Sequence, residues 1–164
     1  MNSIYHRISV RKYEQRPVEA EKTLELIKAG MAAPSAGNQQ PWEFYVITNR
    51  EMLDALSTVS PYAGMLKQAP AAIITAYHQK SRMPEYAQID MAISMENMWL
   101  EADRIGLGGV MLGIAPLEER MSQVEEIVGI PEGQRAFAIF SYGYPAESRA
   151  QQDRFDESRI HYLR

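Results

Sequence analysis

One loop indicates the fold more strongly than any other part of the chain: Ala33-Pro34-Ser35-Ala36-Gly37-Asn38-Gln39-Gln40-Pro41-Trp42. Its two prolines restrict the backbone, and Gly37 permits a left-handed turn. The hydroxyl and amide side chains between them offer donors and acceptors that suit the polar edge of a flat heterocycle. The alternative interpretation is a helix cap followed by a polar turn. Under either interpretation, Trp42 is expected to anchor the loop in the core.

A second informative stretch, Arg7-Ile8-Ser9-Val10-Arg11, lies near the N-terminus. Alternate side chains of an extended segment point the same way, so two guanidinium groups and a hydroxyl would be aimed together. A phosphate monoester needs such cationic, bidentate donors beside neutral ones. Taken alone, the triplet could also be a solvated basic turn. Together with the loop, it indicates a ligand such as a phosphorylated flavin.

Composition is that of an ordinary globular protein. The chain has 164 residues, of which 46% are hydrophobic and 23% charged, and we expect a single domain over 1–164. No apolar run approaches the length of a membrane span, and the N-terminus lacks a secretory pattern. These features predict a cytoplasmic protein without membrane contact. The net charge of −4 argues against a nucleic-acid partner.

Cysteine is absent, which excludes disulfides, thiol chemistry and thiolate metal sites. The three histidines are His6, His78 and His161, and none has the spacing of a metal motif. We therefore expect no metal site. No Ser–His–Asp arrangement is convincing enough to indicate a hydrolase, and no other side chain stands out as a nucleophile.

Hydrophobic periodicity predicts alternating strands and helices with uneven connections. The expected helices are Glu19–Ala32, Glu51–Val59, Ala87–Ile105 and Leu117–Val128. The expected strands are Glu43–Thr48, Ala71–Tyr77, Gly108–Gly113 and Arg135–Gly143. This order indicates an α+β fold, with one mixed central sheet flanked by helices on both sides. The chain after Pro145 is polar and is expected to be irregular.

Two helices carry specific expectations. In the first, Leu24, Ile27 and Met31 share one apolar face. The long helix has a narrow polar stripe on an otherwise apolar surface, formed by Asp90, Ser94, Asn97 and Glu101. Because an ordinary surface helix keeps a wide polar face, we expect cover from the core and from a second subunit. The alternative is the central helix of a monomer.

Glycines follow the long helix in Gly106-Leu107-Gly108-Gly109. The last glycine of GxGxxG is missing and no strand–turn–helix order surrounds the run, so we reject a dinucleotide-binding site of the Rossmann type. These glycines are expected to end the helix and allow a close backbone approach. Backbone N–H groups of Met111–Ile114 could donate to a cofactor ring. The pairs Glu118-Glu119 and Glu125-Glu126 are expected to be solvated.

At these residues the chain resembles the FMN-dependent nitroreductase family, as a small single-domain member. The opening Arg7–Tyr13 is similar to the RxSxRxF/Y start of that family, and residues 33–42 resemble its APSxxNxQPW loop. Gly106–Gly113 matches a third landmark, and Arg154–Tyr162 resembles an ending with arginine and "VHY". The likeness covers essentially the whole chain.

The resemblance implies an intertwined homodimer, with two FMN sites at the interface and a C-terminal segment reaching over the partner. Arg7, Ile8, Ser9 and Arg11 would hold the phosphate and ribityl chain, with Arg154 joining at the phosphate. Met111, Leu112, Gly113 and Ile114 would lie by the ring, with the Gly113 backbone near N5. The partner would supply its Pro34, Ser35, Ala36 and Asn38. Some relatives carry a cation where this chain has Gln152, and an aromatic residue where Met111-Leu112 stand.

By resemblance, the expected activity is that of a flavin oxidoreductase. FMN would take a hydride from NADH or NADPH through N5, with no catalytic side chain required, and then reduce a small-molecule acceptor such as a nitroaromatic or a quinone in a ping-pong cycle. Two alternatives stay open. One is a non-catalytic module that stores or senses FMN. The other is a specialised dehalogenase or enone reductase, although only His78–Tyr86 occupies the stretch where such enzymes carry a lid.

Overall fold

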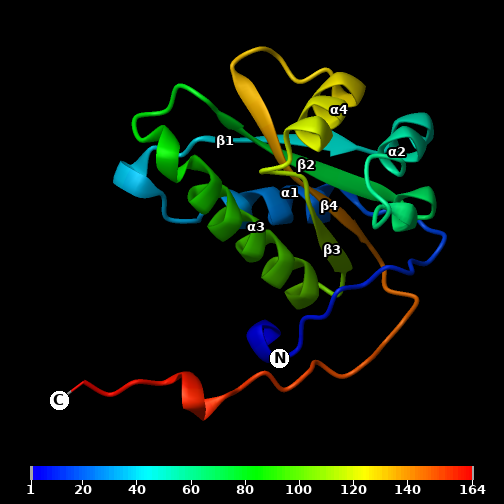
Figure 1. The fold of residues 1–164 in the computed structure, drawn as a ribbon. Coiled ribbons are helices and arrows are strands. Elements are labelled where there is room, and N and C mark those ends of the chain that lie inside the picture. Colours follow the sequence, from blue (N-terminus) through cyan, green and yellow to red (C-terminus); the bar gives the residue numbers. More distant parts are fainter. Residues whose placement is uncertain (1, 164) are drawn as a thin grey trace.

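A sheet of four strands lies at the centre of the computed structural model, which describes residues 2–163 (Figure 1). The strands are β1 (Trp42–Ile47), β2 (Ala71–His78), β3 (Gly108–Gly113) and β4 (Gln134–Gly143). Their order is β1-β2-β4-β3, and every neighbouring pair is antiparallel. The N-terminal segment runs parallel to β3 at an isolated bridge between Ser9 and Gly109. The sheet is therefore mixed only through its N-terminal segment.

Helices cover both faces of the sheet (Figure 1). They are α1 (Ala20–Met31), α2 (Arg50–Leu56), α3 (Ala87–Arg104) and α4 (Glu118–Val128). The pair α1 and α3 packs on one face, whereas α2 and α4 lie on the other. Short 3-10 turns are Ser3–Tyr5, Ala36–Asn38, Gly64–Lys67, Pro84–Tyr86 and Glu157–Arg159. The predicted α+β class is confirmed, and each predicted helix and strand is present within a few residues of its expected ends.

Two apolar cores follow from the alternation of strand side chains. On β2, Ile73 faces the core under α1 and α3, whereas Ile74 faces the core under α2 and α4. Phe140 and Ile139 divide in the same way on β4. All four side chains are fully buried. Trp42 is 9% exposed and belongs to the second core, which confirms its expected role as an anchor.

A β-bulge interrupts this alternation near the start of β4. Thr75 pairs with Ala138 and Ala76 with Ala136, so Phe137 has no partner on β2. Its carbonyl accepts hydrogen bonds from Ile114 N at 3.2 Å and from Ala115 N at 2.9 Å. Such bulges redirect a strand and leave backbone groups available to other partners. Here the bulge holds the chain just after β3 ends.

The expected apolar face of α1 is wrong in detail. Leu26 and Gly30 are buried, whereas Leu24 and Met31 remain about half exposed. A Cβ built on Gly30 would lie 2.9 Å from Met98 Cγ, so α1 approaches α3 closely at this glycine. The face of α1 that carries Gly30 therefore packs against α3. Two of its large apolar side chains face outward.

The polar stripe of α3 faces the interior of the molecule, whereas the polar face of a surface helix ordinarily faces solvent. Asp90 is 2% exposed, Ser94 is fully buried, and Asn97 Nδ2 donates to the Ala29 carbonyl at 3.2 Å. By contrast, Ile89 and Ile93 are 55% and 37% exposed. Hydrogen bonds satisfy Asp90 and Asn97 in this position, whereas the buried Ser94 hydroxyl has no hydrogen-bond partner. The helix presents isoleucines to its surroundings instead.

The residues after β4 leave the body of the molecule as an extended segment that passes below the N-terminal turn (Figure 1). Apolar side chains near its end are exposed, with Ile160 at 42%, Tyr162 at 73% and Leu163 at 96%. The expected irregular course of this region is confirmed apart from the 3-10 turn. No helix within residues 2–163 is long and apolar enough to span a membrane.

Candidate cofactor site

The N-terminal segment lies against the outer edge of β3. Val10 N donates to the Gly109 carbonyl at 2.9 Å, and the Val10 side chain is only 3% exposed. A Cβ on Gly108 would fall 2.6 Å from Val10 Cγ2, so only glycine permits this approach. The predicted close passage of backbone at these glycines is confirmed. The side chains around Val10 are thereby fixed relative to the sheet.

The segment after β4 runs beside this N-terminal segment. Ala146 N donates to the Lys12 carbonyl at 2.9 Å, and the carboxylate of Glu147 accepts from Arg11 N at 2.6 Å. Further along, Gln151 Nε2 donates to the Arg7 carbonyl at 2.9 Å. These bonds bring together polar and charged residues from the N-terminal and C-terminal parts of the sequence.

A hollow of about 220 Å³ opens between the two segments. Three guanidinium groups and one hydroxyl contribute to its wall, and no carboxylate does. The lining residues are Arg7, Ile8, Ser9, Arg149, Ala150, Gln151, Gln152 and Arg154. This donor set suits a phosphate monoester, because arginine offers charge together with fork-shaped donors. Of the predicted residues, Arg7, Ile8, Ser9 and Arg154 meet here.

Arg7 is held between this hollow and α3. Its guanidinium carbon lies 4.1 Å from the Trp99 ring centroid, and its Nε lies 3.3 Å from the Glu96 carboxylate. That Nε atom is buried and makes no hydrogen bond. Stacking on the indole fixes the direction of the side chain, and it leaves donors on the guanidinium for a ligand.

Arg11 does not share the hollow with Arg7 and Ser9. It lies instead in a neighbouring hollow of about 410 Å³, whose other lining residues are Ser60, Tyr62, Val110, Met111, Leu112, Gly113 and Arg120. The three residues therefore line two hollows of one chain, Arg7 and Ser9 the first and Arg11 the second. The segment passes over the edge of β3, so its residues reach different hollows. Sequence reasoning assigned no site role to Ser60, Tyr62 or Arg120.

The edge of β3 exposes backbone donors in this second hollow. In an antiparallel strand, the N–H and C=O of one residue point to the same side, and the side alternates along the strand. Gly109 turns its carbonyl outward to Val10, so Met111 and Gly113 also face the outer edge. Nothing lies within 4 Å of a Cβ built on Gly113, so the space above it is open. A flat polar ring could receive these donors.

Ile114 cannot contribute in the same way. Its N–H is committed to the Phe137 carbonyl, and its side chain is fully buried in the core. The expected donor run Met111–Ile114 is thus reduced to its alternate members. The alternation along β3 accounts for this difference, because it directs the Ile114 N–H toward β4, where the Phe137 carbonyl accepts it.

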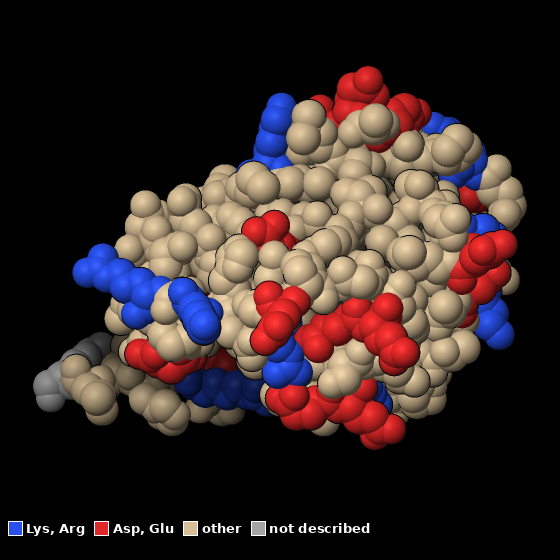
Figure 2. Space-filling view, turned by 90° about the horizontal axis from the view of Figure 1, so that it is seen from above, with Lys and Arg blue, Asp and Glu red and all other residues tan. Residues whose placement is uncertain are grey.

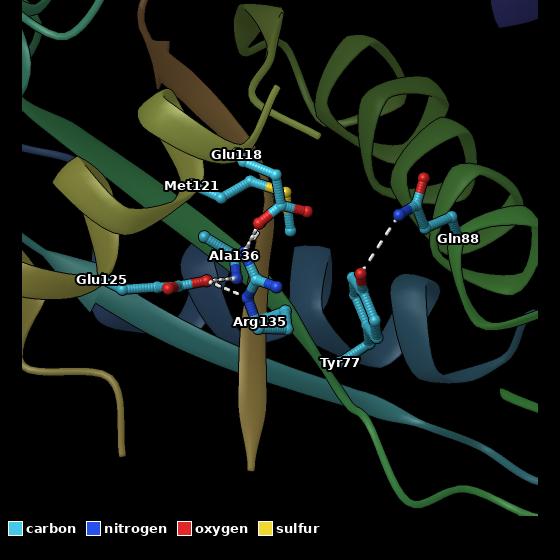
Figure 3. Close-up of polar contacts among 7 residues, drawn as sticks. All are labelled: Tyr77, Gln88, Glu118, Met121, Glu125, Arg135 and Ala136. Carbon is cyan, nitrogen blue, oxygen red and sulfur yellow. Dashed lines mark hydrogen bonds and ion pairs between the residues drawn. The ribbon is translucent and has the colours of Figure 1, made fainter. Parts of the chain in front are cut away.

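Arg135 fastens α4 to the strand that carries the bulge (Figure 3). Its Nε donates to Glu125 at 2.8 Å and its Nη2 to Glu118 at 2.6 Å, while Glu125 also accepts from Ala136 N at 2.9 Å. These carboxylates raise the pKa of Arg135 through charge-assisted hydrogen bonds. The expectation of a solvated face is wrong for Glu125, whose side chain is 19% exposed, whereas Glu118 pairs with Arg135 and stays 75% exposed. The network steadies the turn that follows Gly113.

A second contact in the same view joins α3 to the sheet. Gln88 Nε2 donates to the Tyr77 hydroxyl at 3.1 Å, near the N-terminal end of the helix (Figure 3). The Tyr77 side chain is 9% exposed. This bond fastens the N-terminal end of α3 to β2. The same end of the helix carries Asp90, which holds the loop of residues 33–42.

The loop of residues 33–42 is fastened by Asp90. The Asp90 carboxylate accepts from Ala36 N at 2.8 Å and from Gln39 Nε2 at 2.6 Å. Gln39 also accepts from Met83 N at 2.7 Å, and the Ser35 hydroxyl accepts from Gln40 N at 3.0 Å. The Gln39 side chain therefore ties the loop to Met83 and Asp90, contrary to the expectation that it serves a heterocycle. The role of Asp90 was not predicted.

Backbone strain accompanies this fixed loop. Gly37, Asn38 and Gln40 have φ values of 55°, 54° and 48°. The left-handed conformation is costly for residues with a Cβ unless surrounding bonds impose it. Pro34 and Asn38 remain exposed. Neither they nor Ser35 and Ala36 line either hollow of the same chain, so one chain does not bring all predicted site residues together.

Surface charge adds a constraint on the ligand. The face seen from above shows groups of acidic side chains with basic ones between and around them, and no broad basic surface (Figure 2). Among residues 2–163, no cluster of three or more His, Asp or Glu side chains could hold a metal ion. The three arginines around the 220 Å³ hollow are thus a cationic group in a chain whose net charge is −4.

Fold and site together define an α+β protein with an arginine-lined hollow beside the edge of its sheet. The chain belongs to the Nitroreductase family, whose sequence model matches residues 4–60 and 57–144.

Individual relatives agree with this assignment. A protein of Archaeoglobus fulgidus, provisionally named an NADH dehydrogenase/NAD(P)H nitroreductase, is 40% identical over 98% of this chain and 95% of its own length. A solved structure from Clostridium acetobutylicum, provisionally named an NADH oxidase, has a TM-score of 0.95 at 44% identity and covers 99% of both chains. An FMN-dependent nitroreductase of Clostridium difficile has a TM-score of 0.92 at 26% identity, over 99% of this chain and 98% of its own.

Proposed function

We propose that this chain is an NAD(P)H-dependent oxidoreductase that binds FMN, and that residues 1–164 act as one FMN-binding domain in the cytoplasm. The observation that carries the proposal is the 220 Å³ hollow lined by three arginines and Ser9, which lies beside a strand edge with open backbone donors. The family membership and the FMN-dependent relative of Clostridium difficile support the choice of ligand.

Arg7, Ser9 and Arg154 would hold the phosphate, because they bring cationic and neutral donors to one small hollow. Arg11 would face the ring system, where its charge favours an electron-rich ligand. The outward N–H groups of Met111 and Gly113 would donate to polar ring atoms. Bound FMN would supply hydride chemistry at N5, taking a hydride from NADH or NADPH and passing it to a nitroaromatic or a quinone.

The site would be completed in a homodimer. Pro34, Ser35, Ala36 and Asn38 lie on a loop that lines neither hollow of its own chain, so a second copy would have to present them. Exposed apolar side chains on α1 and α3 and along the C-terminal segment support a large interface, because such surface is unfavourable in water. The C-terminal segment would reach over the partner.

A steady-state assay tests the activity. Purified protein with saturating FMN should oxidise NADH or NADPH when menadione or a nitrofuran is supplied. Binding of FMN without turnover with either nucleotide would instead favour the non-catalytic module. A specialised dehalogenase or enone reductase is less favoured, because only residues 79–86 separate β2 from α3 and leave little chain for a lid.

A further inference from the structure

Arg149 is a cation that neither the family resemblance nor the loop motifs assign to the site. It lines the 220 Å³ hollow together with Arg7, Ser9 and Arg154. Its Nη2 donates to the Ser9 carbonyl at 2.9 Å. The guanidinium is therefore held against the residue whose hydroxyl contributes to the same wall.

This contact leaves most of the Arg149 donors free. A guanidinium carries five N–H groups in a planar fork, and the bond to Ser9 uses one of them. Arg149 also borders two other hollows, but Glu147 lines both of these, and Asp103 lines one of them. The hollow shared with Ser9 is the one of the three whose wall contains no carboxylate. No carboxylate in that hollow therefore balances the charge of Arg149.

The other cations do not suffice for a phosphate monoester. Such a group carries about −1.5 to −2 charges at neutral pH. Arg7 is already paired with Glu96 at 3.3 Å and stacked on Trp99. Gln152, on the same wall, is neutral. Arg154 would thus be the one remaining uncommitted cation without Arg149.

We propose that Arg149 is a phosphate-binding residue of this protein, and that it makes the site selective for flavins that carry a phosphate. The inference rests on the proposed binding of FMN. Its backbone bond to Ser9 preorganises the guanidinium, so little freedom is lost when the anion enters.

The test compares FMN with riboflavin, which lacks the phosphate. Dissociation constants are measured by quenching of flavin fluorescence for the wild type and for Arg149→Gln, at low and moderate salt. We expect FMN to bind at least about tenfold more weakly to the variant, with a smaller salt dependence, while riboflavin is unaffected. Arg159→Gln removes the same charge from an exposed side chain that does not line the hollow, and should leave both constants unchanged.

A rescue separates charge from structure. Arg149→Lys, or Gln152→Lys added to Arg149→Gln, should recover most of the FMN affinity, because each returns a cation to the wall. Equal FMN affinity in Arg149→Gln and the wild type would overturn the proposal. So would an equal loss for FMN and riboflavin, since that pattern indicates a structural role through Ser9. A wild type that binds neither flavin would instead overturn the proposed function itself.

Discussion

Arg11 and Arg154 lie in different hollows, so their removal should weaken different parts of the proposed cofactor contact. Arg154→Gln should weaken FMN binding by about tenfold or more and leave riboflavin binding unchanged, because it faces the phosphate. Arg11→Ala should weaken FMN and riboflavin to a similar degree, because it faces the ring. Fluorescence titrations of both variants check this division, and a phosphate-specific loss in Arg11→Ala would contradict it.

Tyr13 offers a residue-scale test of the N-terminal packing. Its hydroxyl donates to the Val10 carbonyl at 2.8 Å and accepts from Ser141 Oγ at 2.9 Å. Burial raises the pKa of Tyr13 above its ordinary value of about 10. The folded state therefore keeps its proton when the unfolded chain has lost it. This contribution to stability is complete below pH 10 and falls by about 1.4 kcal/mol per pH unit above it.

We expect Tyr13→Phe to cost about 1 kcal/mol at neutral pH and to flatten the loss of stability between pH 10 and pH 11. Urea unfolding at several pH values measures both effects. Tyr62→Phe is the matched control, because Tyr62 is 74% exposed. An identical alkaline slope in Tyr13→Phe and the wild type would rule out this role for the buried phenol.

At the scale of elements, Asp90 joins α3 to the loop of residues 33–42. Asp90→Asn would place an amide donor against the Gln39 amide and remove the charge that strengthens both bonds. We expect a loss of about 1–3 kcal/mol in the free energy of urea unfolding. Asp54→Asn, at an exposed position of α2, should stay within about 0.5 kcal/mol of the wild type. Similar losses in the two variants would contradict the role of Asp90.

Arg135 joins α4 to β4 through two carboxylates. Arg135→Met should destabilise the protein by about 1–3 kcal/mol, because the half-buried Glu125 would lose its cation. Amide hydrogen exchange should also quicken in α4 more than in α1. Arg104→Met removes an exposed pair on α3 and should have a much smaller effect. Unchanged exchange in α4 would show that the network does not secure this helix.

Helix and strand positions were largely predictable because their signals are local. Alternating apolar runs, the prolines and the glycine after α4 identify where elements begin and end. The orientation of α3 was not predictable, since Asp90 and Asn97 of its polar stripe bond to residues distant in sequence, Ala36 and Ala29. The same reason explains why Glu125 was expected in solvent, since its partner Arg135 lies on another element.

The site residues divide in the same way, between those with a local sequence signal and those placed by contacts distant in sequence. Arg7, Ile8, Ser9 and Arg154 were expected together and do line one hollow. Arg149 was visible only as a member of a dispersed C-terminal set with Arg154, Arg159 and Arg164, the last of which lies outside the described residues. Its bond to Ser9 spans 140 positions of sequence. Nothing in the pattern of residues indicates such a contact.

At the scale of the whole molecule, the exposed isoleucines of α3 bear on assembly. Ile89 and Ile93 are 55% and 37% exposed, on a face of the helix about a quarter-turn away from its buried polar stripe. If a second copy covers them, Ile93→Glu should place a charge in an apolar interface, dissociate the homodimer and reduce FMN affinity together. Light scattering after size exclusion measures the assembly. Glu126→Gln, on α4, is a surface control; a dimeric Ile93→Glu variant would exclude this interface.

Native mass spectrometry of the purified protein, mixed with excess FMN, tests the central claim most directly. We expect one dominant species of two chains and two FMN molecules, and no flavin on any single chain, because each site would draw residues from both copies. A protein that stays monomeric and free of FMN, or a single chain that holds FMN as firmly as the pair does, would contradict the claim.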